Sequence, residues 1–407
     1  MGLHVTFFIP PNAVTASFFA VCPRGLEGAL SDELQLLGAQ ALRSEAGGVA
    51  FTGALSVAYA ANLHCRIASR ILWQVGRRGY LSEQHLYDAT QEVRWQDLML
   101  PAQTLRVDVT ASRSPLHSLE FAMLRIKDGI VDRLRDLTGT RPSIDRTNPD
   151  VRVFAFLDAS TVTLYVDLSG EALFKRGWRA DKGEAPLKEN LAAGLLALSG
   201  WQPDLPLVDL FCGSGTIVIE AASIAARRAP GINRRFAFER LRGFDSHAWR
   251  RLKDAARAAA SDAASAPLVG SDISTRVVEQ AVKNAHLAGL QSWLDDGRLR
   301  FDAVDARVAT PGATRGMIIS NPPYGEQSAP RSAAVGDMMH NVGDRLKQHF
   351  TGYDAWFLTS DRQLPKQMRL QETRKTVLFN GPLECRFFRF ELVAGGYRPR
   401  AAMLAST

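Results

Sequence analysis

The sequence predicts an α/β protein in which an open, largely parallel sheet follows an N-terminal α+β region. From Leu187 onward, apolar strand segments alternate with helical segments, which is the pattern of a parallel sheet with crossover helices. The last two strand segments are separated only by residues 380–384, so these two strands must pair antiparallel. Before residue 170, strands and helices follow one another without that regular alternation.

Length and composition are those of a globular protein with two or three domains. The chain has 407 residues, of which 46% are hydrophobic and 22% are charged. Its apolar runs, such as residues 5–9, are far shorter than the roughly 18 residues of a membrane helix, and they lack the flanks of a signal peptide. We therefore expect a cytoplasmic protein with no membrane partner.

The cysteines predict reduced thiols and no bound metal. There are four of them, widely scattered and without a C-x-x-C pair, which is the spacing that zinc ribbons and iron–sulfur sites use. They are Cys22, Cys65, Cys212 and Cys385.

The N-terminal region is predicted from apolar periodicity, which is two residues in strands and 3.6 in helices. The expected strands are at residues 17–21, 48–52, 105–110, 151–157 and 161–168. The expected helices are at residues 26–37 and 118–137, with a mixed helix–strand segment at 62–75. The last two strands form a hairpin, and the region ends near Gly170.

The C-terminal region supplies seven further strands. They are expected at residues 205–211, 268–272, 300–304, 317–320, 355–359, 375–379 and 385–392. The helices between them are expected at residues 216–227, 247–264, 275–288 and 335–349. Seven strands that end in a hairpin outline a Rossmann-like class I methyltransferase domain rather than a dinucleotide-binding domain.

A glycine-containing turn follows the first of these strands. Its glycines permit positive φ angles and close approach of a ligand, and the amides that open the next helix suit a carboxylate or phosphate. No third glycine stands at the spacing of the G-x-G-x-x-G fingerprint, which argues against a nicotinamide cofactor. The residues expected to hold a cofactor here are Asp209, Gly213, Ser214, Gly215 and Thr216.

Two more acidic residues stand at strand ends. Asp272, followed by Ile273, can accept both ribose hydroxyls of an adenosine, and Asp305 can accept from an adenine amino group. Each residue could instead cap a helix. Because ligands bind at the carboxyl ends of parallel strands, the three acidic strand ends together favour a binding edge.

The sequence Asn321-Pro322-Pro323-Tyr324 follows the fourth strand. The prolines fix φ and remove N–H groups, so the Asn321 side-chain oxygen and the Pro322 carbonyl are available as acceptors. Hydrogen bonds from both N–H groups of an exocyclic base amine would localise its nitrogen lone pair, and Tyr324 could stack on a base taken out of its helix. The loop therefore predicts methylation of an amino nitrogen without a strong general base.

Positive charge is concentrated in the second half of the chain. The net charge is +7, and residues 201–407 hold 28 basic and 21 acidic residues, densest between residues 227 and 253. A basic, aromatic linker at residues 174–182 is either a solvated hinge or a strip that contacts RNA. Its candidate RNA-binding residues are Lys175, Arg176, Trp178 and Arg179.

These motifs carry a family resemblance over nearly the whole chain. Residues 209–216 and 321–326 resemble the amino-methyltransferases that bear an (N/D/S)-P-P-(Y/F/W) motif. Residues 22–27, 175–179, 185–192 and 379–386 are similar to the THUMP-containing branch, the RNA guanine-N2 methyltransferases. The form with one methyltransferase domain resembles the N-terminal half of fused bacterial large-subunit rRNA enzymes.

The resemblance implies four parts and a set of roles. Residues 1–54 would be a ferredoxin-like part, 55–168 a THUMP RNA-binding domain, 169–190 a basic linker and 191–407 the methyltransferase domain. S-adenosylmethionine would be the cofactor and a guanosine of 23S ribosomal RNA the substrate. The Gly213–Gly215 turn would hold the methionine, Asp272 the ribose, and Asp305 with Ala306 the adenine. Pro186, Leu187 and Glu189 belong to a segment that would fold over the cofactor.

Other functions remain open at this point. A tRNA guanine-N2 enzyme would use the same parts, and a DNA adenine-N6 enzyme the same catalytic loop, although the N-terminal region argues against DNA. A C5-pyrimidine enzyme would need a nucleophilic cysteine, and residue 320 is Ser. A catalytically inactive RNA-binding factor is the last alternative, and it would have no need of both the Gly213–Gly215 turn and the Asn321–Tyr324 loop. The related loops often have Arg after Glu326, where this chain has Gln327.

Overall fold

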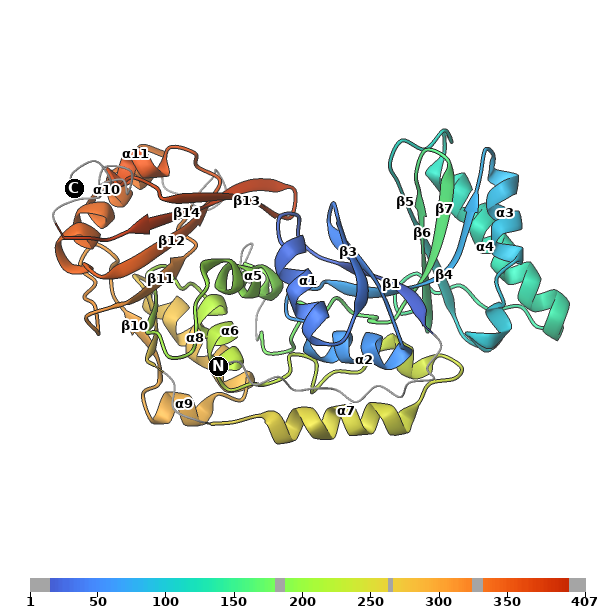
Figure 1. The fold of residues 1–407 in the computed structure, drawn as a ribbon, viewed down its shortest axis with the longest axis horizontal. Coiled ribbons are helices and arrows are strands. Elements are labelled where there is room, and N and C mark those ends of the chain that lie inside the picture. The colour runs from blue at the N-terminus through green and yellow to red at the C-terminus, as the bar shows by residue number, and fades with distance from the viewer. Residues whose placement is uncertain (1–14, 180–186, 263–265, 324–331, 395–407) are drawn as a thin grey trace, which may run out of the picture. The chain divides into compact units, whose positions relative to one another are not determined.

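The computed structural model describes residues 15–179, 187–262, 266–323 and 332–394 (Figure 1). The chain divides into two compact units. The first contains residues 30–173 and 231–256 with the segment before residue 23, and the second contains residues 23–29, 174–230 and everything after 256. Residues 231–256 thus belong to the first unit although they interrupt the sequence of the second.

The first unit is built on one seven-stranded sheet in the order β2-β3-β1-β4-β7-β6-β5. Its strands are β1 (Ala16–Val21), β2 (Gln40–Glu45), β3 (Gly48–Gly53), β4 (Arg70–Gly79), β5 (Leu105–Ala111), β6 (Val151–Leu157) and β7 (Thr161–Asp167). β4 pairs with β1 along its first half and with β7 along nearly its whole length. A single sheet therefore runs through both of the predicted N-terminal parts.

Helices cover this sheet (Figure 1). They are α1 (Glu27–Leu36, which begins in the second unit), α2 (Leu55–His64), α3 (Glu83–Gln91) and α4 (Leu119–Thr138). α7 (Ser246–Ala259, which ends in the second unit) packs on α2 instead. α4 begins where the Ser118 hydroxyl accepts from the Phe121 amide, and it ends at Gly139 with φ of 72°. α7 runs along α2 and buries Trp249 against Phe238, with ring centroids 5.1 Å apart.

The second unit contains the predicted sheet, in the order β10-β9-β8-β11-β12-β14-β13. Its strands are β8 (Leu207–Asp209), β9 (Leu268–Asp272), β10 (Leu299–Ala303), β11 (Gly316–Ser320), β12 (Tyr353–Thr359), β13 (Arg374–Asn380) and β14 (Leu383–Glu391). The first five are parallel, and β14 lies antiparallel between β12 and β13. The fold class expected from the sequence is confirmed.

The helices of the second unit include three that the sequence pattern did not indicate. In the part of this unit that the structure describes, the helices are α5 (Glu189–Ser199), α6 (Thr216–Ala225), α8 (Thr275–Leu287), α9 (Gln291–Asp295), α10 (Ser332–His349) and α11 (Leu364–Met368). α5 has no polar face, because its residues from Glu189 to Leu196 are all buried. α9 and α11 are each only five residues long. None of the three therefore produces an amphipathic period.

The strand order reverses at β8, which has β9 on one side and β11 on the other. Ligands of open α/β sheets bind at the carboxyl ends of the strands beside such a reversal. β8 and β11 are entirely buried, and the segments that follow them are the two predicted motifs. The fold therefore places both motifs at one edge of the sheet.

Within the residues that the structure describes, no helix has both the length and the apolar character needed to cross a membrane.

Candidate active site

The turn after β8 requires glycine at one position. Gly215 has φ of 85° and caps the N-terminus of α6. A Cβ atom there would lie 2.9 Å from the Phe301 ring and 3.0 Å from the Ala281 side chain, closer than van der Waals contact allows. Both the backbone conformation and the packing therefore exclude a side chain.

Asp272 lies against the same turn. Its carboxylate accepts from the Gly213 amide at 3.2 Å and from the Ser274 amide at 3.0 Å. The neighbouring Ile273 is 69% exposed, which is unusual for a large aliphatic side chain. The end of β9 thus presents a carboxylate and an apolar surface beside the glycine turn.

Asp209 occupies a different position from the one predicted. It is 1% exposed, accepts from the Phe211 amide at 3.2 Å and hydrogen bonds to the Ser320 hydroxyl, which also accepts from the Leu210 amide at 2.8 Å. Burial raises the pKa of Asp209 to about 7, although the Ser320 and Phe211 hydrogen bonds lower it. Asp209 therefore joins β8 to β11 and is not open to a ligand.

The raised pKa of Asp209 predicts a pH-dependent stability. The folded protein keeps a proton that the unfolded chain loses above pH 4, so we expect the free energy of unfolding to fall as pH rises from 4 to 8. Asp209→Asn should flatten this dependence and stabilise the protein at pH 8 by more than about 1 kcal/mol, since a tenfold change in proton affinity is about 1.4 kcal/mol. Urea unfolding across this pH range measures the effect.

The control for this experiment is Asp204→Asn, because Asp204 is exposed in the same unit. Its unfolding curves should match those of the wild type at each pH. Parallel pH dependences for Asp209→Asn and the wild type would show that Asp209 is ionised in the folded protein throughout.

The segment after β11 begins with Asn321, Pro322 and Pro323. Pro322 is buried, and Asn321 is partly buried. The Asn321 Oδ1 atom is shielded from solvent, yet no donor in the described residues reaches it. Other buried side-chain atoms of the described residues, such as Trp249 Nε1 and Trp356 Nε1, likewise meet no hydrogen-bond partner there, but Asn321 is the one that follows β11. Tyr324 and Gln327 lie outside the described residues.

Asp305 and Ala306 follow β10 at the same edge of the sheet. The Asp305 carboxylate pairs with Arg307 at 2.5 Å, and this pairing holds the pKa of Asp305 below its usual range. Ala306 is buried. The backbone continues the sheet, because the Val304 amide donates to the Asp272 carbonyl at 2.9 Å. The carbonyl end of β9 therefore directly supports the start of this segment.

The basic linker differs most from its prediction. Arg176 and Trp178 are buried, and the Arg176 guanidinium pairs with Glu220 of α6 at 3.2 Å. Arg179 donates to Ser214 and to other groups around the glycine turn. The predicted RNA contacts of these three side chains are corrected: Arg176 and Arg179 donate to groups of the second unit, and Trp178 is buried. Lys175 is exposed.

The segment predicted to cover the cofactor is described from Leu187 onward, and Pro186 lies outside the described residues. Leu187 and Glu189 are both buried. One participant was missed: Asn284 of α8 donates to the Ser214 carbonyl at 2.9 Å. A polar residue in the buried stripe that includes Ala281 and Ala285 was the signal that could have revealed it.

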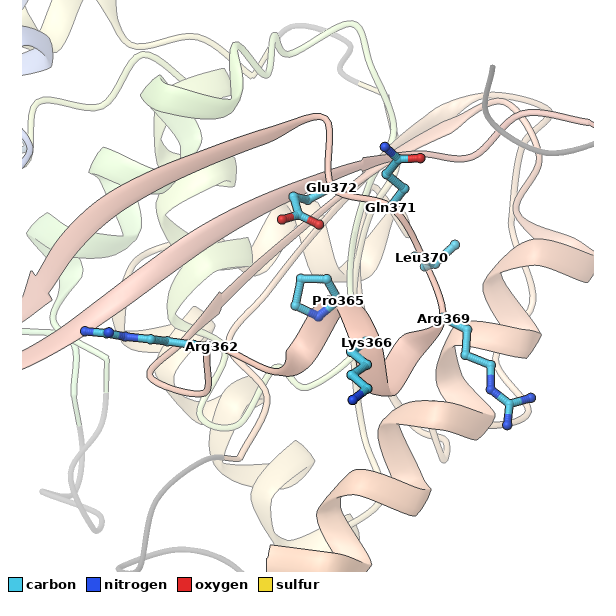
Figure 2. Close-up of a pocket in the computed structure, with 7 residues that line it drawn as sticks. All are labelled: Arg362, Pro365, Lys366, Arg369, Leu370, Gln371 and Glu372. Carbon is cyan, nitrogen blue, oxygen red and sulfur yellow. The ribbon is translucent and has the colours of Figure 1, made fainter. Parts of the chain in front are cut away.

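A hollow of about 580 Å³ lies beside α11 and the segment leading to β13 (Figure 2). Its basic side chains Arg362, Lys366 and Arg369 point in different directions. None of the predicted site residues lines this hollow.

Comparison with known proteins gives three family matches. The RMKL-like methyltransferase domain matches residues 176–389, the RlmL ferredoxin-like domain matches residues 17–72, and the THUMP domain matches residues 80–167. The ribosomal RNA large subunit methyltransferase K/L of Shewanella baltica is 38% identical over 387 residues, which cover 94% of this chain and 54% of that protein. The chain thus spans about half the length of the curated relatives it matches.

Solved structures agree with these matches. SMU.472, solved in complex with S-adenosylhomocysteine (SAH), is 30% identical with a TM-score of 0.84, covering 95% of this chain and 99% of that one. A Listeria monocytogenes protein described as a predicted N6-adenine-specific DNA methylase is 29% identical with a TM-score of 0.83, covering 93% and 96%.

The strand order, with a glycine turn after the first strand and an Asn-Pro-Pro segment after the fourth, defines a class I methyltransferase. The family matches are more specific than the fold. This chain belongs to the RMKL-like methyltransferase family, with ferredoxin-like and THUMP domains in its N-terminal half.

Proposed function

We propose that this protein transfers a methyl group from S-adenosylmethionine to the exocyclic N2 amine of a guanosine in 23S ribosomal RNA. The observation that carries the proposal is the Asn321 Oδ1 atom, a buried acceptor for which the described residues provide no donor. Asn321 follows β11, and β11 pairs with β8, the strand that leads to the glycine turn. An amine N–H is one donor from which this oxygen can accept.

The residues at the sheet edge fit this cofactor. The Gly213–Gly215 turn, with Ser214 and Thr216, would hold the methionine moiety, while Asp272 and Ile273 would contact the ribose. Asp305 and Ala306 would hold the adenine, and the segment from Pro186 to Glu189 would cover the cofactor. Asp209 would act only by fixing β8 to β11. When bound, S-adenosylmethionine supplies the electrophilic methyl group.

The chain's own residues would prepare the amine. Asn321 Oδ1 and the Pro322 carbonyl would accept its two N–H groups, so that the nitrogen lone pair is less delocalised into the ring. Pro323 would keep this segment rigid. Tyr324 would stack on the guanine after it leaves its helix. The proton released from the nitrogen would pass to solvent, which requires no strong general base in the loop.

Ribosomal RNA is proposed as the substrate because of the relatives' names and the THUMP match. The predicted division into residues 1–54, 55–168, 169–190 and 191–407 is part of this proposal, with RNA gripped by the N-terminal parts and methylated by the last. A cytoplasmic location would follow from the substrate. A tRNA is the alternative acceptor, since the same parts could hold it.

Helix α7, most of which belongs to the first unit, would provide a further RNA-contacting surface. It carries Arg250, Arg251, Lys253 and Arg257 against a single acid, Asp254. Arg250 and Arg251 lie on the exposed face opposite the buried Trp249. Other arginines of the basic stretch already have partners within the protein. Arg234 donates to backbone carbonyls, and Arg240 pairs with Asp150.

We expect the double variant Arg250→Ala/Arg251→Ala to weaken binding of a 23S rRNA transcript and to reduce the slope of log affinity against log salt by about 1 to 2. Each lost phosphate contact accounts for somewhat less than one unit of slope. Arg94→Ala/Arg135→Ala is the matched control, because each of these arginines is already paired with an aspartate three residues away. Equal slopes for the two double variants would contradict the α7 contact.

Mass spectrometry of nucleosides tests the function as a whole. Ribosomal and transfer RNA from a strain lacking the gene should be compared before and after incubation with the protein and S-adenosylmethionine. We expect N2-methylguanosine to appear in 23S rRNA only. Its appearance in tRNA would favour the alternative substrate, and N6-methyladenosine would support the chemistry by which the Listeria relative is described.

A further inference from the structure

The Arg179 guanidinium sits among four acceptors of the second unit. Its Nε atom donates to Glu189 Oε1 at 2.7 Å, and its Nη2 atom donates to the Leu187 carbonyl at 2.6 Å. The same Nη2 donates to Thr216 Oγ1 at 3.0 Å, while Nη1 donates to Ser214 Oγ at 3.2 Å. One side chain thus connects the Leu187–Glu189 segment to both hydroxyls of the glycine turn.

These contacts determine how the two hydroxyls can be used. A hydroxyl has one O–H donor and two acceptor lone pairs. Because Ser214 and Thr216 each accept from Arg179, the proton of each hydroxyl is left to donate elsewhere. A hydroxyl that accepts from a charged donor is also a stronger donor itself.

We propose that Arg179 is a positioning residue for the methionine carboxylate of the cofactor, which it serves by orienting the Ser214 and Thr216 hydroxyls as donors. This inference rests on the proposed function, because it assumes that S-adenosylmethionine binds at the glycine turn. Arg179 acts through the hydroxyls, since its own charge is paired with Glu189. Arg179 thereby contributes to cofactor affinity.

The backbone of the turn has supports that do not involve Arg179. Asn284 donates to the Ser214 carbonyl at 2.9 Å, and Asp272 accepts from the Gly213 amide at 3.2 Å. Loss of the guanidinium therefore leaves the turn anchored to α8 and β9. The same substitution leaves the buried Glu189 carboxylate without its counterion, so the stability of each Arg179 variant is measured by urea unfolding alongside its ligand affinities.

Calorimetry with two ligands tests the proposal. SAH carries the amino-acid moiety, whereas 5′-methylthioadenosine has the same adenosine thioether without it. For Arg179→Gln we expect the affinity for SAH to fall at least tenfold and the affinity for methylthioadenosine to change less than twofold. Arg179→Lys should show an intermediate loss of SAH affinity, because one ammonium group cannot make all the hydrogen bonds of a planar guanidinium.

A second variant separates positioning from folding. Thr216→Val removes one hydroxyl at nearly constant volume and should show the same selective loss of SAH affinity. The double variant Arg179→Gln/Thr216→Val should lose less SAH binding free energy than the sum of the two single losses, because both substitutions act on the Thr216 hydroxyl. Additive losses, or equal losses for both ligands, would overturn the positioning role. Failure of the wild type to bind either ligand would instead overturn the proposed function.

Discussion

Asn321→Ala should reduce methyl transfer by at least about a hundredfold while the affinity for SAH stays within about twofold of the wild type. The side chain would contact the reacting amine, and removing one preorganised polar group from a catalytic centre typically costs a hundredfold to a thousandfold in rate. Because the Asn321 Oδ1 atom has no donor in the described residues, its removal breaks no hydrogen bond recorded there. Stability should therefore change little.

The measurement is transfer of a labelled methyl group to rRNA from a strain lacking the gene, with SAH affinity determined in parallel by calorimetry. Asn321→Asp is the informative companion, because it keeps an acceptor oxygen at the same place and should retain part of the activity. Wild-type turnover by Asn321→Ala would refute the catalytic assignment. A loss of SAH affinity equal to the loss of rate would mean that the variant damages the cofactor site instead.

The central strands of the second unit's sheet could be predicted from sequence because nearly all residues of β8, β11 and β12 are buried. Such strands appear as short apolar runs. β8 ends at Asp209, β9 ends at Asp272, and β11 is followed directly by Asn321. β2 was missed for the opposite reason. Five of its six residues are exposed, so it has no apolar alternation.

The functions of individual polar residues were harder to predict. Asp209 stands at a strand end like Asp272, yet only Asp272 reaches the glycine turn. The difference depends on Ser320, which lies 110 residues from the Leu210 amide that it accepts from. Sequence identifies a residue as charged, but burial depends on partners that folding brings from distant positions.

The linker gives the clearest example. Its basic and aromatic composition is equally consistent with an exposed RNA-binding segment and with a segment whose side chains are buried. The acceptors that decide between them are Glu220 for Arg176 and Ser214 for Arg179, which lie 44 and 35 residues away. No local pattern indicates either pairing. Two arginines of one short motif are thereby assigned to different tasks.

Arg176→Met should destabilise the protein by about 3–5 kcal/mol, the usual cost of leaving one charge of a buried pair without its counterion. The side chains of Arg176 and Glu220 are only 4% and 2% exposed. Urea unfolding measures the loss. Arg43→Met is the matched control, because its partner Glu45 and Arg43 itself are more than half exposed, and it should cost less than about 1 kcal/mol.

Replacing both partners distinguishes a charge effect from a packing effect. Arg176→Met/Glu220→Leu removes both charges of this pair, so it should recover most of the stability lost in Arg176→Met. Glu220 lies one turn along α6 from Thr216, so the pair fixes the linker to the helix that begins at the glycine turn. If the double variant is as unstable as the single one, the methylene stem of Arg176, rather than its charge, holds the linker in place. Recovery of stability with unchanged SAH affinity would separate this structural role of Arg176 from the positioning role of Arg179.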